Sequence, residues 1–143
     1  MARDRKPVVG TPKTLCVREM DQLVEWLLRK LCKEDVFPKR SRWVITGKIA
    51  DLLNEAADAL FEAYEFPVKT QEERDHLHHL QTVARSKLLA LDIRLNQAQR
   101  VLDLNPEHFS HYARLHNNTM DYLDAWMESD LKMFGPPTGL KHK

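Results

Sequence analysis

Four cations lie close together in the stretch VFPKRSRWVITGKIADLL, residues 36–53: Lys39, Arg40, Arg42 and Lys48. Lysine and arginine bind phosphate through their charge and through the release of counterions, and arginine can form two parallel hydrogen bonds. Positive charge at the N-terminus of a helix opposes the helix dipole, so a purely structural helix start does not favour these residues. Their types and spacing predict a contact with phosphate groups, and the alternative is a solvated helix start.

A second group of cations follows further along the chain, within residues 85–102. Arg94 and Arg100 are predicted to contact either RNA or an acidic face of another subunit. For Lys87, seven residues before Arg94, we favour a side chain whose aliphatic stem covers the edge of a core. Arg85 belongs to the same group.

Histidine is the residue type that most invites a metal site, since the chain has seven. A di-iron bundle needs a Glu-x-x-His motif on each of two helices, and this chain has one, Glu73 to His76. Glu73 is better explained as the partner of Thr70 in a capping box. His108 and His111 share a helix face, but no thiolate accompanies them. We therefore predict no metal and no other cofactor.

Catalytic motifs are missing from the sequence. The four glycines form no phosphate-binding loop, and neither a nucleophile elbow nor a set of kinase motifs is present. The sequence therefore predicts a protein that is not an enzyme, with no catalytic residues.

The two cysteines and the absence of long apolar runs bear on location. Cys16 and Cys32 fall in one helical pattern and would lie roughly 24 Å apart along it. A disulfide requires Cα atoms within about 7 Å, so two unpaired thiols are expected, which fits a reducing compartment. No apolar run reaches the roughly 18 residues of a membrane span, and residues 1–10 lack the apolar core of a secretory signal. We expect a cytoplasmic protein without a membrane partner.

Four segments carry helical periodicity, and none shows the strict alternation of a strand. Pro38 separates the first segment from the second, Thr70 precedes the third, and Asn105-Pro106 precedes the fourth. Short connections force successive helices to run antiparallel, so the sequence predicts an all-α, antiparallel up-down-up-down four-helix bundle. We expect the bundle over residues 14–134, a flexible basic arm over 1–13 and a flexible tail over 135–143.

Several expectations concern single positions in these helices. Gly47 costs about 1 kcal/mol relative to alanine inside a helix, which predicts a close approach by a neighbouring helix. Trp43 is expected to seat against the first helix or against another subunit. The core stripe of the fourth helix is predicted from residues at spacings of three and four: Phe109, Tyr112, Ala113, Met120, Leu123, Met127 and Leu131.

Charge is distributed unevenly along the chain, although the formal net charge is only +1. Residues 1–48 hold 12 Lys and Arg against 6 Asp and Glu, whereas residues 49–84 hold 2 against 8. Such opposed zones can steer a partner or pair between subunits. Head-to-tail pairing closes into a ring when the rotation permits, so we expect a homo-oligomer larger than a dimer.

The second helix opens on a distinctive set of residues: Phe37, Pro38 and Lys39, then Arg42 and Trp43, then Gly47 and Ile49. This arrangement resembles a motif of the four-helix-bundle family that includes the proteins encoded by intervening sequences of bacterial 23S ribosomal RNA genes. The family also includes Avd, the accessory variability determinant of diversity-generating retroelements. The long third helix and the Asn-Pro entry to the fourth are more similar to the Avd branch. Phe37, Pro38, Trp43 and Gly47 are the residues that carry this structural motif.

The resemblance implies a non-enzymatic accessory protein that binds a reverse transcriptase and its structured template RNA. It also implies a ring-shaped homo-oligomer, a pentamer. The residues expected to contact RNA are the cations that begin the second helix and the two later arginines: Lys39, Arg40, Arg42, Lys48, Arg94 and Arg100. The near-neutral net charge keeps one alternative open, an oligomeric protein–protein adaptor without direct RNA contact.

Overall fold

Four α-helices make up most of the computed structural model, which describes residues 10–138; residues 1–9 and 139–143 lie outside the described residues. The helices are α1 (Pro12–Leu31), α2 (Gly47–Glu65), α3 (Gln71–Val101) and α4 (Ser110–Phe134). Short 3-10 turns cover Lys39–Ser41 and Pro106–Phe109, and a π turn covers Arg42–Thr46. No strand occurs in the described part of the chain, so the all-α four-helix prediction is confirmed.

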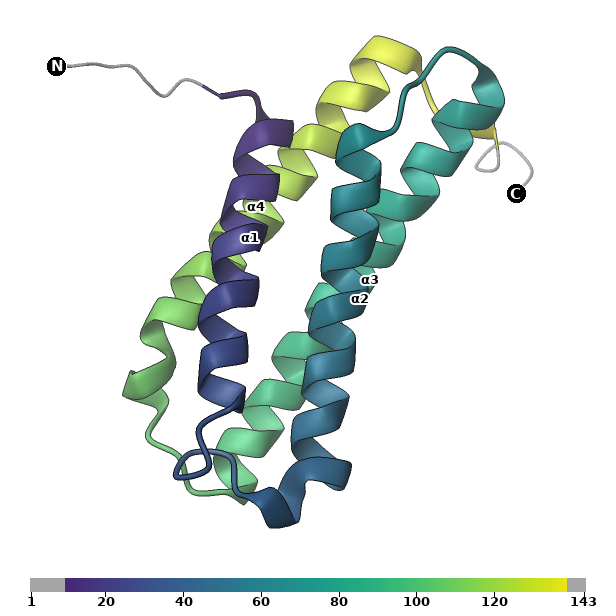
Figure 1. The fold of residues 1–143 in the computed structure, drawn as a ribbon. Coiled ribbons are helices and arrows are strands. Elements are labelled where there is room, and N and C mark those ends of the chain that lie inside the picture. Colours follow the sequence, from purple (N-terminus) through teal and green to yellow (C-terminus); the bar gives the residue numbers. More distant parts are fainter. Residues whose placement is uncertain (1–9, 139–143) are drawn as a thin grey trace, which may run out of the picture.

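The helices lie side by side around one core. Figure 1 shows the chain reversing direction from each helix to the next, with the connections at alternate ends. α1 packs against α4 and α2, and α2 packs against α3. Burying a large aliphatic side chain contributes about 1.5–3 kcal/mol, so this core dominates the stability. Its largest completely buried members are Met20, Leu23, Leu27, Ile49, Leu53, Leu60, Leu88, Leu91, Leu95, Leu115, Leu123 and Gln81.

Side chains cap the starts of α1 and α3. Thr11 accepts a hydrogen bond from the Thr14 N–H at 3.2 Å, and α1 begins at Pro12, two residues earlier than the sequence pattern indicates. The predicted capping box of α3 is confirmed: Thr70 Oγ1 accepts from the Glu73 N–H, and Glu73 Oε1 accepts from the Thr70 N–H, both at 3.1 Å. These bonds satisfy N–H groups that have no partner within a helix.

The end of α4 is tied to the start of α3. Gly135 terminates α4 with φ 79, a conformation that glycine adopts without a steric penalty. Its carbonyl oxygen accepts a hydrogen bond from Arg74 Nε at 3.1 Å, and the Thr138 N–H donates to Asp75 Oδ1 at 2.7 Å. Residues 135–138, expected as the start of a flexible tail, therefore contact α3.

The inner face of α4 is more polar than its predicted stripe. Ala113 and Leu131, both predicted as core, are exposed, and the prediction is wrong for them. His116 and Asp130 are buried instead. They have partners on α3, since His116 Nε2 lies 2.9 Å from the Leu88 carbonyl oxygen and Asp130 Oδ2 accepts from Gln81 Nε2 at 2.9 Å. Because the core of α4 was predicted from apolar residues alone, that prediction could not identify buried polar residues such as His116 and Asp130.

Both cysteines are unpaired, with Cys16 buried and Cys32 exposed. Among the helices of residues 10–138, none combines the length and the apolar character needed to cross a membrane.

Candidate nucleic-acid interface

The connection from α1 to α2 is held in place by one buried aromatic residue. Phe37 is buried and meets Phe109 edge-on, with ring centroids 6.4 Å apart. Phe109 in turn packs edge-on against Trp26 of α1 at 6.0 Å. Immediately after Pro38, the Ser41 hydroxyl donates to the Pro38 carbonyl oxygen at 2.8 Å. The segment that carries the predicted cations is therefore fixed at its start.

The glycine at the start of α2 has a local explanation. The Gly47 N–H donates to the Arg42 carbonyl oxygen, five residues earlier, which closes the π turn. A Cβ atom on Gly47 would lie 3.0 Å from that oxygen, and no side chain of another described helix would come within 4 Å of it. The predicted close approach by a neighbouring helix is therefore wrong. The tight contact is with the π turn itself, and such turns recur at functional sites.

Trp43 points out of the fold. It is 84% exposed, and Val44 beside it is 72% exposed. The expectation that Trp43 seats on α1 is wrong, because the core is closed at this end by Phe37 instead. Coverage of Trp43 by another subunit stays a prediction.

The six cations predicted to bind RNA are all exposed. None of them forms an ion pair with a carboxylate of the described residues. They lie in the two turns that lead into α2, in the first turn of α2 and in the last turns of α3. These segments meet at one end of the bundle in Figure 1. We call this the basic end, formed by Lys39, Arg40, Arg42, Lys48, Arg94 and Arg100. Sequence reasoning treated them as two patches, and the fold brings both to one end.

Two further cations of α3, Arg85 and Lys87, form ion pairs inside the bundle. Arg85 Nε lies 2.7 Å from Asp124 of α4, and Lys87 Nζ lies 2.9 Å from Glu55 of α2. The hydrogen bond that Arg85 donates to Asp124 raises the pKa of Arg85 and so strengthens the charged pair. These contacts link α3 to its neighbours, which agrees with the structural interpretation of Lys87.

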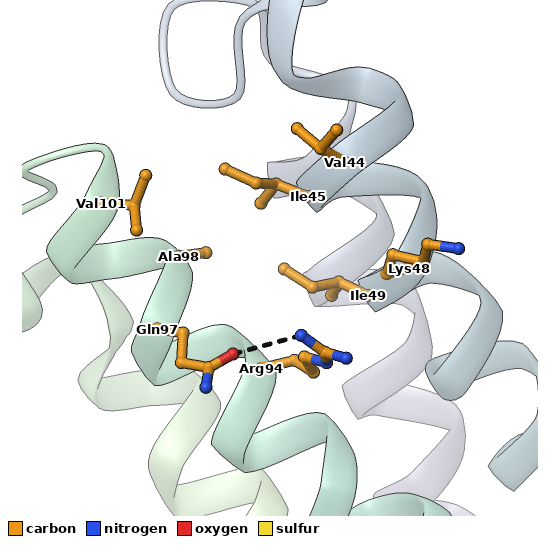
Figure 2. Close-up of a pocket in the computed structure, with 8 residues that line it drawn as sticks. All are labelled: Val44, Ile45, Lys48, Ile49, Arg94, Gln97, Ala98 and Val101. Carbon is orange, nitrogen blue, oxygen red and sulfur yellow. Dashed lines mark hydrogen bonds between the residues drawn. The ribbon is translucent and has the colours of Figure 1, made fainter.

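A groove of about 310 Å³ runs between the start of α2 and the end of α3 at the basic end. In Figure 2, Val44, Ile45 and Ile49 face Ala98 and Val101 across it. The guanidinium of Arg94 closes one end and donates to Gln97 Oε1 at 3.4 Å. Lys48 lies on the rim with its ammonium group directed outward. The groove therefore has aliphatic walls, with polar groups at one end and on its rim.

Sequence reasoning missed the exposed aliphatic side chains around this groove. Besides Val44, Val101 is 68% exposed and Ile93 is 59% exposed. Ile93 lies between two leucines of the buried stripe of α3, and Val101 follows the last buried residue of that helix, Ala98. These positions were the signal available in the sequence. They give the basic end an apolar component.

Elsewhere in the described part of the bundle, Arg74 Nη1 and Gln81 Oε1 are the buried side-chain polar atoms without a hydrogen-bond partner. No three His, Cys, Asp or Glu residues of the described chain are arranged to hold a metal ion. Burial lowers the pKa of His78, and the nearby Arg74 charge adds to the effect. Tyr112 donates its hydroxyl proton to Asp92 Oδ1 at 2.9 Å, and burial together with that carboxylate raises the pKa of the tyrosine. The exposed cations and the groove at the basic end therefore form the candidate site.

Comparison with protein-family models, with curated proteins and with solved structures finds no match to this chain.

Proposed function

We propose that this protein is a non-enzymatic accessory scaffold of a diversity-generating retroelement. It binds the reverse transcriptase of that element and its structured template RNA, and it supports mutagenic cDNA synthesis in the cytoplasm. The resemblance of its second helix to the Avd family supplies the element and the partner. The observation that carries the RNA contact is the gathering of six exposed cations, without carboxylate partners in the described chain, at one end of the bundle.

The cations of the basic end have no carboxylate partner among the described residues. An exposed cation that is already paired within the fold gives up that pair when it binds phosphate, as Arg85 and Lys87 would. The cations of the basic end keep their full charge available. Each phosphate that they neutralise releases condensed counterions, which drives binding at moderate salt. Repetition of the basic end in a homo-oligomer would raise the effective concentration of these weak contacts.

Co-purification tests the proposal directly. Tagged protein, expressed with its retroelement, should retain both the reverse transcriptase and the template RNA. A variant with alanine at all six cation positions should lose the RNA. Alanine at Arg18, Lys69 and Lys132, exposed cations at the opposite end of the bundle, should leave it bound. Wild-type protein that retains neither partner would contradict the proposal.

An oligomeric protein–protein adaptor without RNA contact is the second candidate. Exposed apolar side chains favour it, since Val44 and Ile93 at the basic end and Met133 near the end of α4 are largely accessible. Such side chains can form the centre of a protein interface. Retention of the reverse transcriptase by the six-alanine variant, with no RNA bound by the wild type, would support the adaptor instead.

A further inference from the structure

Trp43 differs from the other two tryptophans of the chain in having no packing partner. Trp26 meets Phe109 edge-on at 6.0 Å, and Trp126 is buried. Trp43 is exposed to 84% and contacts no other aromatic ring of the described residues. A tryptophan side chain can bury 150–250 Å², so this indole contributes little to the fold and offers a large face to a partner.

The surroundings of Trp43 select the chemistry of that partner. Residues 36–50 contain four cations and no Asp or Glu. Arg42 directly precedes the tryptophan, and Lys39 and Arg40 lie in the turn before it. An apolar protein surface could cover an indole, but it would leave these charges without counterions. A polyanion with accessible aromatic faces satisfies both groups, and the combination of aromatic side chains with cations is how unpaired nucleic acid is bound.

The segment that carries Trp43 is preorganised. The Phe37–Phe109 contact and the Ser41–Pro38 hydrogen bond fix its start, and the bond from Gly47 to Arg42 closes its π turn. A partner therefore binds a backbone that is already ordered, which lowers the entropic cost of binding.

The groove beside this segment extends the same surface. Val44, the neighbour of Trp43, forms one wall, and Arg94 and Gln97 supply donors and an acceptor at the closed end (Figure 2). Its volume of about 310 Å³ and its aliphatic walls suit a flat ring with polar edges.

We infer that Trp43 and the adjoining groove bind an unpaired segment of RNA, with one base stacked on the indole and phosphates against the surrounding cations. The inference rests on the proposed RNA-binding function and adds the class of substrate. Bases in a duplex are stacked on each other and cannot reach the indole, so single-stranded or looped RNA is preferred.

The experiment compares Trp43→Ala, Trp43→Phe and the control Met133→Ala, an exposed apolar residue at the opposite end of the bundle. Affinity is measured by fluorescence anisotropy for a single-stranded RNA of about 12 nucleotides, within the usual site size, and for a duplex of the same composition. Stacking is worth about 1–3 kcal/mol per base, so Trp43→Ala should weaken single-strand binding about 5- to 150-fold. The slope against salt should not change, and Trp43→Phe and Met133→Ala should bind nearly as the wild type does.

Intrinsic fluorescence of the wild-type protein gives a second readout that needs no destabilising variant. A stacked base should quench the Trp43 emission, and Trp43→Phe should lose that quenching. Single-strand affinity unchanged in Trp43→Ala, together with no quenching, would overturn the inference while leaving phosphate binding by the cations intact. A fall in oligomer mass that accounts for the whole loss of affinity would identify the indole as a protein contact and also overturn it. Wild-type protein that binds no RNA would overturn the proposed function as well.

Discussion

The backbone N–H of Gly47 donates a hydrogen bond to the carbonyl oxygen of Arg42, and a Cβ on Gly47 would lie 3.0 Å from the same oxygen. This pair of constraints explains both the glycine and the π turn. One extra residue in a turn changes the phase of the preceding side chains by about 100° relative to a continuous α-helix. Because of this change in phase, Trp43 and Val44 in the turn point out of the fold, whereas the buried stripe of α2 begins at Ile49.

Substitution of Gly47 tests this explanation. Gly47 has ordinary helical dihedrals, φ −63 and ψ −37, so only the contact with the Arg42 oxygen opposes a side chain. The contact of an added Cβ with the Arg42 oxygen should outweigh the gain of about 1 kcal/mol in helix propensity. We therefore expect Gly47→Ala and Gly47→Leu to lower the free energy of unfolding by similar net amounts, about 1 kcal/mol, because both add the same Cβ. The rest of a leucine side chain has room in the neighbouring groove of about 340 Å³ that Gly47 lines. Urea unfolding measures both effects.

Asn54→Ala, at an exposed position of α2, reports helix propensity alone and should be neutral or stabilising. A leucine at position 47 that destabilises the protein several-fold more than alanine would instead indicate overpacking against a neighbouring helix. A stabilising Gly47→Ala would show that the Arg42 carbonyl moves away at little cost.

The two thiols should differ sharply in reactivity. Burial, with a smaller effect from the Asp124 charge, raises the pKa of Cys16 to about 12, and its Sγ lies 3.7 Å from the Thr119 carbonyl oxygen. Since the thiolate is the reactive form, native Cys16 should react on the order of 10³-fold more slowly than an ordinary thiol at pH 8. A thiol-reactive chromophore should label only Cys32 in the native protein and both cysteines in denaturant.

Cys32→Ser is the matched control, and its native form should show almost no labelling. Rapid labelling of this variant in native buffer would mean that α1 opens readily from α4 and that Cys16 is not part of a closed core.

Local signals predicted much of the fold. The apolar spacing of α3 and the Thr70–Glu73 capping box both act within a few residues, and both are confirmed. Positions whose environment depends on distant residues were predicted poorly. Asp130 is buried because Gln81, 49 residues away, lies opposite it, and the sequence offers no sign of that pairing. Leu131 was assigned to the core on its residue type and is exposed.

For the candidate site too, features set by neighbouring residues were predictable from the sequence, whereas features set by the packing of distant segments were not. The sequence singled out the cations before and at the start of α2, because a cation at a helix N-terminus is locally unfavourable. The structure shows that they are exposed, and their contact with RNA stays a prediction. It did not predict that Lys48 and Arg94 line one groove, since that depends on how α2 and α3 pack. Nor did it predict the exposure of Trp43, which follows from Phe37 closing the core at this end and from the π turn that an extra residue creates.

Asp130 should give the stability a distinct dependence on pH. Burial raises its pKa above the ordinary value, and the Gln81 hydrogen bond and the Arg74 charge oppose that shift only in part. A carboxyl whose pKa is raised in the folded state stabilises the fold below its unfolded pKa, and that contribution is lost as pH rises through the folded pKa. Relative to Asp130→Asn, the wild type should therefore lose free energy of unfolding as pH rises above about 4, the ordinary pKa of an aspartate.

Asp75→Asn serves as the comparison, because the pKa of Asp75 is lowered rather than raised and its contribution to stability should change with pH in the opposite direction. The backbone hydrogen bond from Thr138 is the largest cause that lowers the pKa of Asp75, so its contribution is present at neutral pH and is lost on acidification. Urea unfolding at a series of pH values measures both differences. A difference between wild type and Asp130→Asn that stays constant, or that grows as pH rises, would contradict the assignment.

Assembly is expected from the separation of charge along the bundle. The cations of the basic end lie opposite the α2–α3 connection, where acidic residues such as Glu62, Glu65 and Glu72 are exposed. Head-to-tail contact of this acidic surface with cations outside the basic end, which would leave the basic end open to RNA, can close a ring, and the resemblance to Avd-like proteins makes the expected ring a pentamer. Native mass spectrometry at micromolar concentration should show it, and Glu62, Glu65 and Glu72 changed together to Gln should weaken it. Detection of monomer alone would contradict both the ring and the analogy.

The salt dependence of RNA binding tests the basic end most directly. Each phosphate contact removed should flatten the slope of log affinity against log salt by about 0.7 to 0.9. Changing Lys39, Arg40 and Arg42 together to Ala should therefore reduce the slope by about 2 to 3, and changing Arg94 and Arg100 by about 1 to 2. Circular dichroism should show an unchanged helical fold, because all five side chains are exposed.

The variant with alanine at Arg18, Lys69 and Lys132 removes the same charge as the first set and should keep the parent slope. Equal flattening by all three variants would indicate a general effect of net charge, and parent affinity in both basic-end variants would leave RNA contact to the reverse transcriptase alone.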